Sequence, residues 1–114
     1  MKGYDTHATQ LDSHAALMTE MSETIKAFYD ATVELGIEDE VTTFTASDFS
    51  RTYSPNGTGA NTGSDHAWGG HALVCGGAVK GREIYGQMPT LEIGGPSDVD
   101  TNNGRGRWLP TTSV

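Results

Sequence analysis

The sequence has only one cysteine, Cys75, so the chain cannot form an internal disulfide. This residue lies in the apolar run ALVCGG, where no neighbouring base would favour a thiolate, and we expect a buried core thiol. Long apolar runs are also absent, so no membrane-spanning helix is expected. The N-terminal stretch MKGYDTHATQ lacks the apolar region of a secretory signal. The sequence therefore predicts no membrane partner and leaves the cellular location open.

Basic residues are scarce. Seven lysines and arginines accompany 15 aspartates and glutamates, for a net charge of −8 and a pI near 4.7. Nucleic acids and anionic membrane surfaces both require a basic footprint, so neither is an expected partner. An acidic chain can bind cations, although we expect most of the excess charge on the solvated surface. At 114 residues the chain is long enough for a single domain, residues 1–114.

Several catalytic signatures are missing. The chain has no G-x-S-x-G nucleophile elbow, no H-E-x-x-H zinc helix, no Walker loop and no cysteine cluster. Tandem repeats and heptad arrays are also absent. Any chemistry must therefore come from less regular groups of polar residues.

A helical pattern extends from residue 10 to residue 35. We expect Asp12 or Ser13 to cap its start and Gly36 to end it in a left-handed conformation. The apolar residues recur at spacings of three, four or seven, which predicts one buried stripe: Leu11, Ala15, Met18, Met21, Ile25, Phe28 and Leu35.

Strands are predicted at residues 41–47 and 71–79, with a short hairpin or edge strand around residues 84–85. Between the first two lies a long loop, residues 48–70, rich in glycine, serine, threonine and asparagine; a loop of this length is either functional or disordered. In the polar tail, residues 96–114, we expect the pair Trp108 and Leu109 to dock and the rest to be loop.

This order of elements predicts an α/β fold with a partial three-layer, doubly wound sheet, one long helix, two or three short strands and long glycine-rich loops. A helix, a short turn and a strand form half of a parallel crossover unit. A single helix covers only one face of a sheet, whereas parallel strands are normally covered on both. We therefore expect the chain to form a homo-oligomer or to pair with a missing segment.

Two stretches carry the first candidate site residues. Asp5 and His7 are two apart in GYDTHATQ and would point to the same side of an extended segment, a pairing suited to zinc, manganese or iron. A loop histidine bonded to its own neighbour is the alternative. Asp48, in TASDFSRT, follows a predicted strand at the edge where open α/β sheets bind ligands; a simple Asx turn is equally consistent.

The remaining histidines are not equally good candidates for metal ligands. His66, in GSDHAWGGH, lies on the long loop and is the better ligand candidate, whereas His71 begins a predicted strand and suits a structural role. His14 is expected on the helix surface or in packing. A catalytic triad could also be written with a histidine and one of three serines, but the sequence gives no geometry to support one. The three serines are Ser47, Ser50 and Ser64.

Three stretches, residues 3–52, 63–91 and 104–114, together resemble the C-terminal part of a large bacterial family, domain of unknown function 1501. The motifs GYDTHATQ, TASDFSRT and GSDHAWGGH carry the resemblance, which covers essentially the whole chain. The family is grouped with the sulfatases in the alkaline phosphatase superfamily. This resemblance implies a doubly wound α/β fold and a site for two metal ions, drawn from zinc, manganese, magnesium and calcium.

The resemblance also implies roles for individual residues. Asp5 and His7 look like the pair that binds one metal ion, and His66 like the late histidine that returns to that ion, with Asp65 supporting it. Asp48 looks like the acid that binds the other ion, but Phe49 stands at its partner position and cannot ligate. Members of the superfamily take their nucleophile from an N-terminal half that this chain lacks, and relatives are typically longer and exported.

The leading hypothesis is a hydrolase of small-molecule esters, of the phosphatase or sulfatase type. A divalent metal would activate water, with His66 or Asp48 as the base. A metal-free, serine-dependent esterase is the first alternative, in which His7, His66 or His71 would assist the serine. A non-catalytic, oligomeric fragment is the second.

Overall fold

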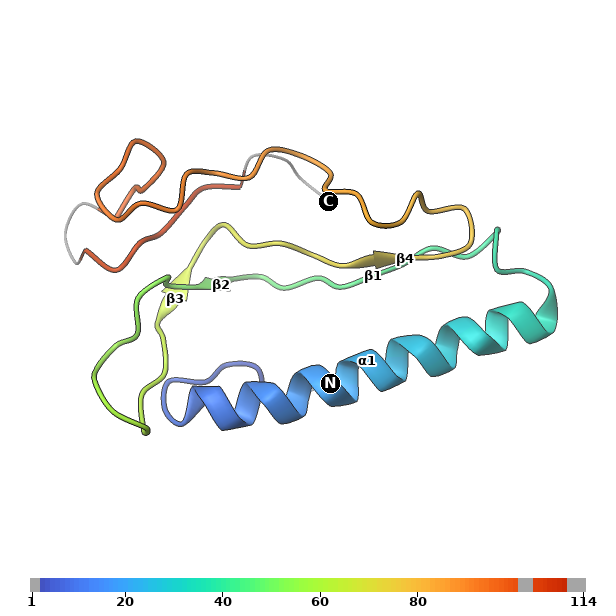
Figure 1. The fold of residues 1–114 in the computed structure, drawn as a ribbon, viewed down its shortest axis with the longest axis horizontal. Coiled ribbons are helices and arrows are strands. Elements are labelled where there is room, and N and C mark those ends of the chain that lie inside the picture. The colour runs from blue at the N-terminus through green and yellow to red at the C-terminus, as the bar shows by residue number, and fades with distance from the viewer. Residues whose placement is uncertain (1–2, 101–103, 111–114) are drawn as a thin grey trace.

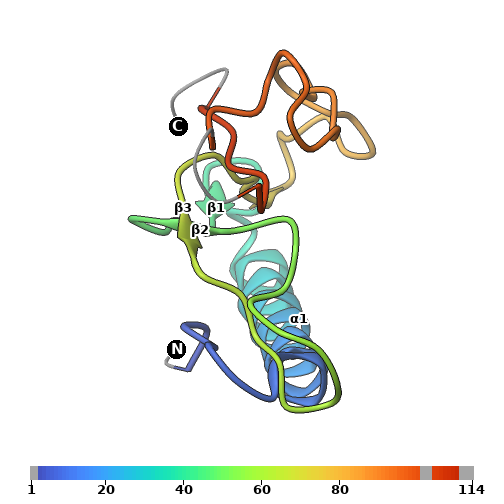
Figure 2. The ribbon, with the colours of Figure 1, turned by 90° about the vertical axis from the view of Figure 1, so that its left-hand side faces the viewer.

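A computed structural model describes residues 3–100 and 104–110 of the chain. One helix lies beneath a set of extended segments, and the C-terminal loop lies above them, within overall extents of 51 × 30 × 21 Å (Figure 1 and Figure 2). The elements, in chain order, are α1 (Gln10–Leu35), β1 (Thr43–Phe44), β2 (Ser50–Arg51), β3 (His66–Ala67) and β4 (Val74–Cys75). The protein is thus a mixed α/β chain with little regular strand.

Helix α1 has the predicted bounds. It ends in a Schellman motif, in which Gly36 adopts φ 67° and donates to Val33 O at 3.0 Å, while Ile37 N donates to Thr32 O at 3.0 Å. The predicted cap is wrong, because Thr9 occupies the N-cap position and makes no side-chain capping bond. Among the described residues, no helix is both long and apolar enough to cross a bilayer.

The buried face of α1 is only partly the predicted stripe. Met21 and Ile25 are half-buried, as expected, but Leu11 is 82% exposed and Leu35 71%. Leu17 takes the place predicted for Met18, because Tyr4 donates its hydroxyl to Leu17 O at 2.8 Å and holds the N-terminal segment there. The helix therefore leaves much of its apolar surface uncovered.

β1 and β4 lie within the predicted strand segments, whereas β2 and β3 lie in the predicted loop, and the pairing differs from the prediction. β1 pairs antiparallel with β4 (Thr43↔Cys75), and β2 pairs antiparallel with β3 (Ser50↔Ala67). Between the two ladders, Thr45 N donates to Leu73 O at 3.0 Å. Residues 43–52 and 65–75 thus form one long, interrupted hairpin.

This hairpin corrects the sequence-based picture in two places. Its strands need no crossover helix, so they run antiparallel rather than parallel, and the doubly wound, three-layer arrangement is not seen in the described residues. The predicted loop, residues 48–70, includes β2 and β3 and the hairpin tip between them. Period-two patterning could not reveal two-residue strands.

The C-terminal loop docks through one of its two predicted anchors. Trp108 is buried, packs edge-on against Tyr53 with ring centroids 5.4 Å apart, and donates Nε1–H to Thr90 O at 3.1 Å. Leu109 is exposed, and so are residues 84–85, which form no strand. Parts of the predicted tail, residues 101–103 and 111–114, lie outside the described residues.

The apolar core is small. Ala67 and Trp108 are the apolar residues that are buried among those described, and Cys75 is only half-buried rather than a core thiol. The chain exposes 8243 Å², against about 6,000 Å² for a compact monomer of its mass. Its radius of gyration is 16.5 Å, against about 13 Å for a compact domain of this length. Several apolar side chains of α1 are therefore exposed to solvent.

Candidate metal centre

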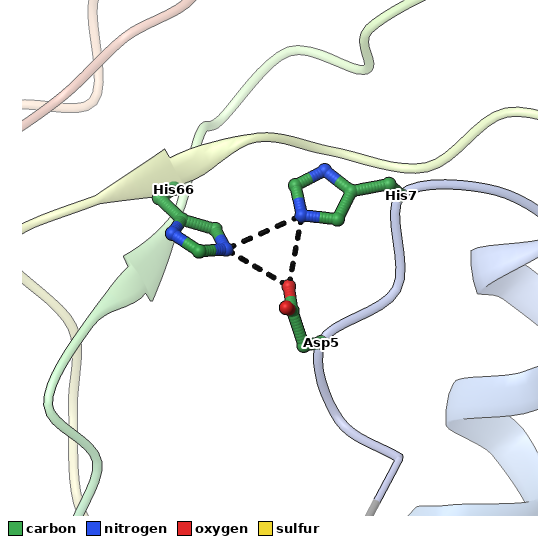
Figure 3. A group of neighbouring side chains, drawn as sticks. All are labelled: Asp5, His7 and His66. Carbon is green, nitrogen blue, oxygen red and sulfur yellow. Dashed lines mark hydrogen bonds and ion pairs between the residues drawn. The ribbon is translucent and has the colours of Figure 1, made fainter.

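Three potential metal ligands converge at one end of the molecule: Asp5, His7 and His66 (Figure 3). Asp5 Oδ1 lies 3.0 Å from His7 Nε2 and 2.9 Å from His66 Nε2, and the two Nε2 atoms are 3.2 Å apart. Each side chain is about half exposed (49–51%). The three atoms form a nearly equilateral triangle that opens to solvent.

The size of this triangle suits a metal ion. With ligand bonds of about 2.0–2.1 Å, adjacent ligand atoms of a tetrahedral zinc site are about 3.3–3.4 Å apart. The observed separations of 2.9–3.2 Å need to widen only slightly. Two imidazoles and one carboxylate are also a donor set that zinc, manganese and iron accept. The residues therefore fit a divalent ion that keeps a further position open to water.

A glycine brings the first two ligands to the third. The N-terminal segment crosses the hairpin beside Gly63, where Ser64 N donates to Thr6 O at 3.3 Å. A Cβ atom on Gly63 would stand 2.2 Å from the backbone carbon of His7. Only glycine lets the two backbones approach this closely, and that approach places Asp5 and His7 beside His66 on β3.

Arg51 anchors Asp5. From β2 its Nη1 donates to Asp5 Oδ1 at 2.5 Å, and Nη2 donates to Thr6 O at 2.8 Å. The same guanidinium donates to the carbonyl and hydroxyl of Ser64. Hydrogen bonds from His66 and then Arg51 hold the pKa of Asp5 below its ordinary value. Arg51 was not among the predicted site residues; the clue to it in the sequence was its position three residues after Asp48, in a chain with few basic residues.

Asp65 supports a different histidine from the one the resemblance implies. Its Oδ1 lies 3.5 Å from His7 Nδ1, whereas His66 contacts Asp5. Burial raises the pKa of Asp65, but a hydrogen bond from Asn56 and the charge of Arg105 outweigh that effect, so the pKa is lowered. Asp65 thus faces His7 and not His66, the histidine that the resemblance assigns to it.

His66 is oriented by two further contacts. Phe49 stacks on its ring with centroids 3.9 Å apart and an interplanar angle of 12°, and Arg107 Nε donates to His66 O at 2.9 Å. Asp48, next to Phe49, is exposed and lies outside the group of three ligands. The structure therefore brings together three of the four predicted metal ligands and leaves Asp48 apart.

The other predicted polar residues lie elsewhere. His71 is exposed and precedes β4, and His14 Nε2 contacts Thr6 Oγ1 at 3.1 Å, a packing role. Ser47 donates its hydroxyl to Phe49 O, and the buried Ser64 hydroxyl accepts from Arg51 Nε. Within residues 3–100 and 104–110, the three candidate serines make no hydrogen bond to a histidine, so nothing there supports a triad.

Comparison with known proteins adds the family and no function. Residues 1–101 match the model of a family described as "Protein of unknown function (DUF1501)". No curated protein and no solved structure matches the chain. Because the match spans most of the sequence, the chain belongs to this family.

Proposed function

We propose that this member of the DUF1501 family is a metal-assisted hydrolase of ester bonds, with a divalent ion held by Asp5, His7 and His66. The observation that supports this proposal most strongly is the convergence of two Nε2 atoms and one carboxylate oxygen within 3.2 Å of one another on a half-exposed surface. The motifs that resemble the sulfatase-like branch of the alkaline phosphatase superfamily support the same reaction class.

The ligand types favour particular ions. Imidazole nitrogens suit zinc, manganese and iron, whereas magnesium and calcium prefer all-oxygen sites. We therefore propose zinc or manganese ahead of magnesium or calcium. A bound ion of this kind would polarise the ester and lower the pKa of water beside it.

Residues of the chain would supply the general base and the orientation of the ligands. His66 directs Nε2 into the ligand group, so its use as a ligand leaves no lone pair for a base on that atom. Asp48 is then the better base of the two predicted, as an exposed carboxylate one residue from the ring that stacks on His66. Arg51 would keep Asp5 pointed at the ion.

Metal titration of the 114-residue chain tests the proposal. Zinc and manganese binding is measured by calorimetry, and ester hydrolysis is measured before and after chelation. His7→Ala and His66→Ala should each abolish stoichiometric binding, whereas His71→Ala, an exposed histidine outside the group, is the matched control and should not. Binding that survives both ligand variants, or turnover that is insensitive to chelator, would contradict the proposal.

The proposal includes the larger architecture implied by the resemblance. In it, the exposed apolar face of α1 is covered by a second copy of the chain within a three-layer arrangement. Support comes from Leu11, Phe28 and Leu35, apolar side chains of α1 that the described residues leave exposed. The substrate would be a small-molecule ester.

A further inference from the structure

His7 lies between two carboxylates. Its Nε2 is 3.0 Å from Asp5 Oδ1, and its Nδ1 is 3.5 Å from Asp65 Oδ1. A neutral imidazole carries one proton, so one of these nitrogens carries the hydrogen that faces its carboxylate and the other presents a lone pair. Which nitrogen holds the proton decides whether His7 can ligate through Nε2.

The contacts of Asp5 favour a lone pair on His7 Nε2. Asp5 Oδ1 already accepts from Arg51 Nη1 at 2.5 Å and contacts His66 Nε2 at 2.9 Å. These two donors use both lone pairs of that oxygen. His66 Nε2 also contacts His7 Nε2 at 3.2 Å, and because His66 Nε2 must be the donor toward the Asp5 carboxylate, His7 Nε2 is the acceptor of this contact. The His7 proton is then left for Nδ1, on the side of Asp65.

Asp65 is itself held in place as an acceptor. Arg105 donates Nη1–H to its Oδ2, and Asn56 donates Nδ2–H to its Oδ1 at 3.3 Å. The backbone N–H of Asp65 donates to Thr52 Oγ1 at 3.1 Å. Asn56 also donates to the carbonyl of His7 at 3.0 Å, so a single amide spans the carboxylate and the backbone of the histidine that faces it.

We propose that Asp65 is a positioning residue that keeps the proton of His7 on Nδ1 and thereby presents Nε2 as a lone-pair donor to a divalent ion. Metal binding by this lone pair rests on the proposed function. The proton position itself is a property of the metal-free protein. A carboxylate on the distal nitrogen of a ligand histidine fixes its tautomer and ring orientation, and the loss of such a partner lowers metal affinity about 10–100-fold.

Nitrogen-15 NMR of the histidine rings tests the proposal in the metal-free 114-residue chain at a pH where the imidazoles are neutral. We expect protonated Nδ1 and unprotonated Nε2 at His7. Asp65→Ala should shift the proton toward Nε2, and Asp65→Asn, which keeps an oxygen acceptor, should restore the Nδ1 signature in part. Asp30→Asn, at an exposed aspartate that pairs with Lys26 on α1, is the control and should leave His7 unchanged.

The outcomes are distinct from those of the metal proposal. His7 protonated on Nε2, or on both nitrogens, in the unmodified protein would overturn the inference, as would a signature indifferent to Asp65→Ala. If Asp65→Ala fails to fold, the unmodified protein and Asp65→Asn still decide it. If the Nδ1 signature depends on Asp65 but the protein binds neither zinc nor manganese, the positioning role of Asp65 stands and the metal-assisted hydrolase proposal is removed.

Discussion

Arg51 and His66 are direct partners in the β2–β3 ladder, and both side chains reach the same oxygen, Oδ1 of Asp5. The register of the ladder therefore fixes the distance between Arg51, which anchors the Asp5 carboxylate, and His66, which is a candidate ligand beside it. A one-residue slip of this register would turn one of the two side chains to the other face. The short ladder thus has a larger effect on the site than its length indicates.

Removing the guanidinium of Arg51 should weaken metal binding. Arg51→Gln loses the donors to Asp5 and Thr6, so the carboxylate is no longer held toward the histidines. We expect zinc affinity to fall about 10-fold or more, as for other outer contacts of metal ligands. A competition titration with a chromophoric chelator measures it. Arg82→Gln, at an exposed arginine, is the control, and equal affinities for the two variants would contradict the role of Arg51.

Adding one methyl group at Gly63 should separate the two halves of the ligand group. A Cβ there would stand 2.2 Å from the His7 backbone, so Gly63→Ala must push the N-terminal segment away. Overpacking of this kind costs about 1–3 kcal/mol, which urea denaturation measures. Gly81→Ala, where a Cβ meets nothing within 4 Å, is the matched control. The prediction fails if the two variants have the same stability and zinc affinity.

Acid should release the C-terminal loop. Backbone N–H groups of Gly94, Arg107 and Asp100 donate to the Asp98 carboxylate and hold its pKa below 3.8. A lowered folded-state pKa means that the stabilisation is complete above the ordinary carboxyl pKa and is lost as pH falls through the folded value. Exposure of the buried Trp108 is therefore expected below about pH 4, near the ordinary aspartate pKa.

Tryptophan fluorescence follows this transition. A Trp68→Phe background leaves Trp108 as the single emitter, because the chain has two tryptophans. We expect a red shift on acidification. In the same background, Asp98→Asn should show the red-shifted emission already at neutral pH. A spectrum that is unchanged by that substitution would contradict the anchoring role of Asp98.

The chain should self-associate in solution. Leu11 and Leu35 lie at the two ends of α1, 82% and 71% exposed, and burial of such side chains drives association. Multi-angle light scattering at increasing concentration should show species larger than the 12.1 kDa monomer. Lysine at both positions should shift the population toward monomer, whereas lysine at Glu23, on the polar face, should not. A monomer at every concentration would contradict the proposed second copy.

The helix and its end were predictable because their causes are local. The 26 residues of α1 contain no glycine or proline, and Gly36 supplies the left-handed residue that stops the helix. The cap was missed, because Thr9 takes a left-handed conformation that no preference would predict. The face of α1 that is buried depended on the contact between Tyr4 and Leu17, which is a tertiary contact.

The sequence predicted which residues belong to the candidate site, but it did not predict how they are arranged in space. The motifs singled out Asp5, His7 and His66, and the structure brings these together from segments 59 residues or more apart in sequence. Asp48 was singled out on equal grounds and lies apart, because the strand before it pairs within an antiparallel hairpin rather than at the edge of a parallel sheet.

The sequence by itself determined the length and end of α1, the acidic charge and the family of the chain, since these follow from local conformational preferences and composition. Only the tertiary structure decided that Gly63 admits the N-terminal segment to the hairpin, that Arg51 shares Asp5 with His66, and that Asp65 faces His7 rather than His66. Such relationships arise from close approach between distant segments, and no local pattern encodes them.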